Sequence, residues 1–179
     1  MPQEHFSLTQ GNTKFTQSVS FVSSLARGFI QGYKKGMYRE ANYKVSEQCF
    51  GTDTQSIIIR IFTSWGTPAF DWGQEIVDIQ KMIMLVTDWC EYDEALYQYL
   101  TFCYQGEACM IPNMFQAILK KVFQVTTVAN DVAQLFMEGL PMETDAPSKV
   151  LDFADRLGQN AGKLLRYATD FDPSLAPLA

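Results

Sequence analysis

Three glycines, Gly28, Gly32 and Gly36, recur every four residues in the stretch GFIQGYKKG. The residues around them, from 15 to 44, follow a helical period, with apolar side chains gathered in one sector. Each interior glycine weakens a helix by roughly 0.5–1 kcal/mol relative to alanine. Three are therefore tolerated where they let a second helix approach closely. This ladder requires the helix to pack backbone against backbone on another helix.

The end of the chain carries a matching ladder of small residues. Apolar residues recur at alternating steps of four and three from Val150 to Phe171, which predicts a helix from about 147 to 170. We predict that the two ladders contact each other within one chain, and a contact between subunits is the alternative. The glycines interpreted as close-packing positions are Gly28, Gly32, Gly36, Gly158 and Gly162.

Three more helices are predicted between these two. A helix from Pro112 to Gly139 follows from apolar spacing and from the proline and glycine at its ends. A second covers residues 70–103, either as one helix or as two that meet near Tyr92. A short third helix lies within residues 52–68, although its isoleucine run would also suit a strand. We predict a helix here because the neighbouring segments are helical.

The predicted helix at 70–103 has two distinct sides. Ile76, Ile79 and Ile83 belong to one apolar stripe, which we expect to be buried, and Glu75 and Asp78 belong to the opposite, solvent-facing side. The run MIMLV at 82–86 is apolar in every direction. A helix of this kind is covered on all sides, so we expect a central position for it.

These elements predict an all-α fold. A chain of 179 residues can bury one sizeable core, and no repeat or linker marks a boundary within it. We therefore expect a single domain over 1–179, a bundle of about five helices, with short extended tails at 1–12 and 173–179.

Composition excludes several classes of function. The net charge of −6 opposes nucleic-acid binding, which depends on Lys and Arg at phosphates. No apolar run reaches the roughly 18 residues of a membrane span. The only histidine, His5, lies in the predicted tail, which argues against histidine-dependent catalysis and metal sites. The carboxylates of DWCEYDE, residues 88–94, have the spacing of a solvated helix face. We predict that the protein is not an enzyme and holds no cofactor or metal.

The four cysteines do not by themselves determine the cellular compartment of the protein. They permit three disulfide pairings, of which Cys103–Cys109 would close the corner at Gly106 and Cys49–Cys90 would then be a long-range link. Alternatively, all four are reduced core residues. Disulfides place the protein in a secreted or lumenal setting, whereas reduced thiols place it in the cytoplasm.

Aromatic residues crowd the middle of the chain. Such side chains can line a cavity between helices, although they are more often core. The candidates for ligand lining are Trp65, Trp72, Trp89, Tyr97 and Phe102. We predict a non-enzymatic structural or protein–protein interaction subunit that forms a homo-oligomer through glycine- and aromatic-lined helix faces. The alternative is a carrier that binds an apolar small molecule or lipid between its helices.

Overall fold

The computed structural model describes residues 4–65, 67–68 and 71–173. These residues form seven α-helices and no strand, so the predicted all-α class is confirmed. The helices are α1 (Glu4–Tyr38), α2 (Thr52–Ser64), α3 (Trp72–Cys90), α4 (Tyr92–Gln105), α5 (Ile111–Lys120), α6 (Val122–Met137) and α7 (Pro147–Thr169).

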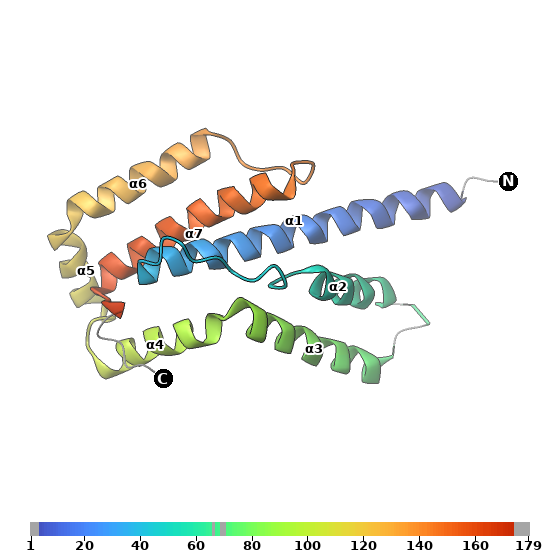
Figure 1. Ribbon diagram of the computed structural model, residues 1–179, viewed down its shortest axis with the longest axis horizontal. Coiled ribbons are helices and arrows are strands. Elements are labelled where there is room, and N and C mark those ends of the chain that lie inside the picture. The colour runs from blue at the N-terminus through green and yellow to red at the C-terminus, as the bar shows by residue number, and fades with distance from the viewer. Residues whose placement is uncertain (1–3, 66, 69–70, 174–179) are drawn as a thin grey trace.

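The first and last helices form the centre of the molecule (Figure 1). Gln17 donates a hydrogen bond to the carbonyl of Glu143 at 2.8 Å, and Gln31 donates one to Asp155 at 3.0 Å. Residue numbers thus rise together along both helices, which makes α1 and α7 a parallel pair. Helices α2 to α6 together form the connection from the end of α1 to the start of α7. In Figure 1, α2, α3 and α4 lie on the α1 side, and α5 and α6 lie on the α7 side.

The two glycine ladders meet at this pair. A Cβ atom added to Gly32 would lie 2.6 Å from the carbonyl carbon of Asp155 and 2.7 Å from the amide nitrogen of Gln159. From the other side, a Cβ atom on Gly158 would lie 2.9 Å from the carbonyl carbon of Phe29. Gly28, Gly36 and Gly162 lie in the same seam. The backbones of α1 and α7 therefore touch, and this close contact is made between two helices of one chain.

The prediction of about five helices is wrong in number, because single residues interrupt two of the predicted helices. Glu91, with φ 48° and ψ 36°, separates α3 from α4 in a left-handed conformation. Lys121, with φ −115° and ψ 26°, separates α5 from α6. The break at Glu91 agrees with the alternative of two helices that meet near Tyr92. The break at Lys121 was not predicted, because the apolar period continues across this residue.

The predicted ends of the chain also differ from the structure. Residues 4–12, expected as an extended tail, belong to helix α1. Residues 1–3 and 174–179 lie outside the described residues, as does Phe70 at the predicted start of the 70–103 helix. The described helix there begins at Trp72, where the Asp71 side chain accepts a hydrogen bond from the Gly73 amide at 2.8 Å.

Two disulfides link segments outside the central pair, and an aromatic cluster connects α4 to that pair. Cys49 and Cys90 link the segment after α1 to the end of α3, and Cys103 and Cys109 close the corner between α4 and α5. Phe171, just after α7, is buried, and its ring contacts three others at centroid distances of 5.1–5.8 Å, those of Tyr38, Tyr99 and Phe102. Within the described part of the chain, no helix is both long and apolar enough to cross a membrane.

Candidate functional site

Helix α3 turns its charged side toward the interior of the molecule and its apolar side toward solvent. Its carboxylates Glu75 and Asp78 are buried, with 5% and 2% of their surface exposed. The stripe formed by Trp72, Ile76, Ile79 and Ile83, by contrast, is 42–67% exposed. A surface helix normally presents charged residues to water and apolar residues to the core. In the single chain, α3 does the opposite over its first three turns.

Helix α2 fixes this orientation by binding the two carboxylates. Ser64 Oγ donates a hydrogen bond to Glu75 Oε1 at 2.5 Å, and Arg60 forms an ion pair with Asp78. Gln74 Nε2 donates a further hydrogen bond to Asp78 Oδ1 at 3.1 Å. The hydrogen bond from Arg60 lowers the pKa of Asp78, so this carboxyl stays ionised although it is buried. The charged side of α3 therefore faces α2, and the apolar stripe is left outside.

The predicted arrangement of this helix was wrong in two respects. The stripe expected to be buried is exposed at Ile76, Ile79 and Ile83, and the face expected in solvent is buried at Glu75 and Asp78. The run MIMLV, expected at the centre, lies in a helix at the edge of the molecule (Figure 1). The helical period was correct. The sequence pattern could not show that α2 would supply Arg60 and Ser64 as partners for the acids.

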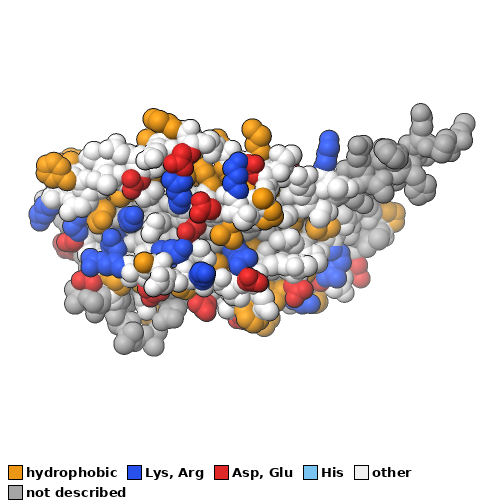
Figure 2. Space-filling model, turned by 45° about the horizontal axis from the view of Figure 1, so that its top comes forward, with side chains coloured by type: hydrophobic (Ala, Val, Ile, Leu, Met, Phe, Trp, Pro, Cys, Tyr) orange, Lys and Arg blue, Asp and Glu red, His pale blue; other side chains and the backbone are white. Residues whose placement is uncertain are grey.

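Exposed apolar side chains continue over α4, α5 and α6. The most exposed large side chain on each is Tyr104, Ile111 and Phe123 respectively, with 93%, 83% and 85% of its surface in solvent. Figure 2 shows one face of the molecule, where positive and negative side chains are interspersed and hydrophobic patches lie among them and toward the edges. We call the large exposed apolar residues of α3–α6 the outer apolar surface: Trp72, Ile76, Val77, Ile79, Ile83, Met84, Trp89, Leu96, Tyr97, Leu100, Tyr104, Ile111, Phe115, Leu119, Val122, Phe123, Phe136 and Met137.

A separate apolar groove of about 450 Å³ lies between α1, α3 and α4. Its base adjoins the buried Cys49–Cys90 disulfide, against which Ile30, Phe50 and Val86 pack. Burial raises the pKa of the Tyr33 phenol in its wall to about 12, with the Tyr99 phenol adding to the shift. The groove is lined by Phe29, Ile30, Tyr33, Lys34, Phe50, Val86 and Leu96.

The aromatic residues predicted to line a ligand site lie elsewhere. Trp65 and Trp72 are exposed and contact each other edge to face, with ring centroids 6.3 Å apart. Trp89 borders a different hollow near the start of α2, Phe102 packs against Phe171, and Tyr97 is exposed. The sequence did hold one signal for the groove. Phe29 and Tyr33 belong to the apolar sector of α1 that lies beside the glycines, and both line the groove.

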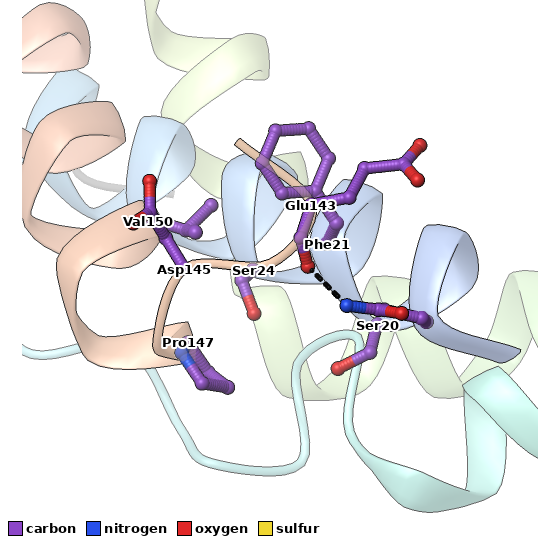
Figure 3. Close-up of a pocket in the computed structure, with 8 residues that line it drawn as sticks. Ser20, Phe21, Ser24, Glu143, Asp145, Pro147 and Val150 are labelled. Carbon is purple, nitrogen blue, oxygen red and sulfur yellow. Dashed lines mark hydrogen bonds between the residues drawn. The ribbon is translucent and has the colours of Figure 1, made fainter. Parts of the chain in front are cut away.

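A smaller, polar hollow of about 180 Å³ lies where α1 meets the turn before α7 (Figure 3). The hydrogen bond from Gln17 to the Glu143 carbonyl crosses it. Asp145 accepts hydrogen bonds from the Met142 amide at 2.8 Å and from Lys149 Nζ at 2.9 Å, which lower the pKa of its carboxyl. These groups fix the turn that begins α7, so the hollow has a structural role.

The residues that the sequence offered for catalysis are exposed or lie outside the described part of the structure. Asp88 and Glu91 of the acidic segment are exposed, and the side chains of His5, Asp93 and Glu94 lie outside the described part. Among the described residues, no three His, Cys, Asp or Glu side chains are grouped to hold a metal ion. Comparisons with protein-family models, curated proteins and solved structures found no match. The function must therefore be inferred from the outer apolar surface and the groove.

Proposed function

We propose that this protein is a non-enzymatic structural subunit that self-associates through its outer apolar surface, with the α3 stripe at the centre of the contact. The reversed polarity of α3 carries this proposal. The stripe places Trp72, Ile76, Ile79 and Ile83 in water, while two carboxylates take the interior positions. Large exposed apolar patches usually mark interaction sites. A second copy of the chain would cover the stripe. It would also cover the exposed side of the MIMLV run, which is apolar in every direction.

The extent of exposed surface supports a large contact. The chain of 20.3 kDa exposes 12020 Å², whereas compact monomers of this mass expose roughly 8,800 Å². The exposed apolar side chains of α3–α6 contribute to the excess. Obligate homodimers bury about 2,000–5,000 Å² in total. The excess surface is thus large enough to supply such an interface.

The uncharged α3 stripe suits a second copy of the chain better than a polyanionic or strongly charged partner. The chain carries a net charge of −6, so two copies repel each other unless their contact avoids the acidic residues. The α3 stripe meets this condition, because its four residues are uncharged and the neighbouring acids Glu75 and Asp78 are turned toward α2. The two disulfides fit assembly in a secreted or lumenal compartment.

Sedimentation velocity on the non-reduced protein tests the proposal. We expect the wild-type chain to sediment as an oligomer, and Ile83→Lys to sediment as a monomer with an unchanged helical circular dichroism spectrum. The new lysine tolerates solvent, since Ile83 is 55% exposed in the single chain, but it would be buried without a partner in the contact. Ile79→Ser provides a milder variant of the same stripe.

The matched control is Asp88→Asn. It changes the net charge by the same amount as Ile83→Lys, on the same helix, at an exposed position outside the stripe. We expect this variant to remain oligomeric. A monomeric wild-type protein at about 100 μM, or an oligomer unaffected by both stripe variants, would contradict the proposal, since stable subunit contacts have dissociation constants well below this concentration.

A further inference from the structure

The groove beside the Cys49–Cys90 disulfide has the chemistry of a site for a long-chain carboxylate. Its volume of about 450 Å³ lies within the roughly 300–1,000 Å³ of small-molecule sites, which are mostly apolar with a few polar groups to orient the ligand. Six of the seven lining residues are aliphatic or aromatic, and the seventh is Lys34. A single cation in an apolar groove matches an anionic head group on an apolar chain.

Lys34 is held in place by groups of this chain and keeps one donor for a ligand. Its ammonium group donates hydrogen bonds to the Glu91 carbonyl at 2.6 Å and to the Tyr43 hydroxyl at 3.2 Å. An ammonium group has three N–H donors. The Glu91 carboxylate lies 3.7 Å from Lys34 Nζ, beyond hydrogen-bond distance, and its side chain is 65% exposed. Among the described contacts, the third N–H therefore has no acceptor at hydrogen-bond distance.

Burial of Lys34 strengthens a hydrogen bond that it donates to an anion, although the carboxylate of Glu91 forms a longer ion pair with it at 3.7 Å. The Lys34 side chain is only 14% exposed, so a charge-assisted hydrogen bond there is screened less by water than one at the surface. The Tyr43 ring lies 4.5 Å from the ammonium nitrogen and orients it further. Phe50 and Val86 pack against the disulfide and form a fixed wall of the groove. The site is therefore preorganised on the protein side.

We propose that this groove binds the alkyl chain of a long-chain fatty acid, with the carboxylate of the fatty acid accepting a hydrogen bond from Lys34. A cationic amphiphile would be repelled by the same ammonium group, and a neutral one would leave its third N–H without an acceptor. The groove is formed by one chain and shares only Leu96 with the outer apolar surface. Its lining includes none of the Trp72, Ile76, Ile79 and Ile83 stripe, so fatty-acid binding can be tested separately from self-association.

Isothermal titration calorimetry of the full, oxidised chain tests the inference with sodium dodecanoate and, as the cationic counterpart, dodecyltrimethylammonium, both below their micelle concentrations. We expect dodecanoate to bind once per chain and dodecyltrimethylammonium to bind at least tenfold more weakly. Lys34→Met should weaken dodecanoate binding about tenfold, because a charge-assisted hydrogen bond is lost. Leu96→Asp should weaken it at least as much, because it places a negative charge in the groove.

Two control variants separate the groove from general surface effects. Lys44→Met removes one cation at an exposed position, and Leu100→Asp adds one acid to α4 a turn beyond Leu96. Both should bind dodecanoate like the wild type. The Ile83→Lys variant should also bind it normally, so a failure of self-association does not affect this test. Equal binding of the two amphiphiles, a stoichiometry far above one, or no loss in the Lys34 and Leu96 variants would overturn the inference.

Discussion

The most direct test of the fold is to add one methyl group at the centre of the α1–α7 seam, in the variant Gly32→Ala. The new Cβ atom would lie 2.6 Å from the carbonyl carbon of Asp155 and 2.7 Å from the amide nitrogen of Gln159. Carbon contacts are most favourable at about 3.5–4.0 Å. These neighbours are backbone atoms, so no side chain can rotate away. The two helices must separate by about 1 Å to relieve the overlap.

The expected cost follows from two opposing effects. Overpacking of a filled interior costs about 1–3 kcal/mol, and the backbone contact places Gly32→Ala toward the upper end of that range. Replacing glycine by alanine within a helix stabilises the helix by roughly 0.5–1 kcal/mol, which offsets part of this cost. We therefore expect a net loss of about 2 kcal/mol in the free energy of unfolding. For a chain of this size, that corresponds to a fall in Tm of about 4–8 °C.

Urea unfolding monitored by circular dichroism measures this loss. It is best carried out in the Ile83→Lys background, because unfolding of an oligomer depends on protein concentration. Gly73→Ala is the matched control, since its added Cβ atom would meet only the Asp71 side-chain oxygen, at 3.3 Å. We expect this control to change stability by less than about 1 kcal/mol. If Gly32→Ala behaved like Gly73→Ala, or stabilised the protein, the backbones of α1 and α7 would not be in contact.

Two further predictions concern the disulfides and the buried phenols. Cys49 and Cys90 are 41 residues apart, and Cys103 and Cys109 are 6 apart; loop entropy then predicts that replacing each pair by serine costs about 4 and about 2 kcal/mol, respectively. A larger loss for the Cys103–Cys109 pair in urea unfolding would refute this order. Burial, with the nearby Glu91, raises the pKa of Tyr43 from 10.0 to about 12. Between these pH values the unfolded chain loses the Tyr43 proton first, so stability should fall as pH rises above about 10. Tyr43→Phe should flatten this fall in urea midpoints measured from pH 9 to 11.5, and an unchanged profile would show that Tyr43 does not contribute.

The helices that could be predicted are those whose signals are local. The period from Val150 to Phe171 and the proline at its start predicted α7, which spans Pro147–Thr169. The glycine ladder of α1 predicted a close helix partner, and the ladder in α7 pointed to which helix that partner is. Both signals depend only on residues three or four positions apart. No such local signal indicates that α1 and α7 are parallel. The long connection formed by α2 to α6 allows this direction.

The break at Lys121 and the groove could not be predicted, for different reasons. Two helices meeting near Tyr92 were one of the two alternatives for residues 70–103, and the structure has this break at Glu91. Lys121 ends a helix without glycine or proline, and the apolar period gives no sign of that break. The groove combines residues from α1, α3, α4 and the segment after α1, whose proximity depends on the Cys49–Cys90 link. Of the three cysteine pairings that the sequence permits, the structure has the one considered above, Cys49–Cys90 with Cys103–Cys109. This pairing brings Cys49 to the end of α3, but it does not indicate how α1 and α4 lie around it.

The reversed orientation of α3 connects fold and proposed function. Periodicity shows that a helix has two sides, but which side turns inward depends on the partner that each side finds. The Ser64 and Arg60 side chains of α2 hold the acidic side, because a buried carboxylate without partners would cost more than the exposed isoleucines. Within one chain the acids and the isoleucines cannot both be satisfied. The proposed self-association would resolve this conflict, since a second copy could cover Ile76, Ile79 and Ile83 while Arg60 keeps Asp78 paired.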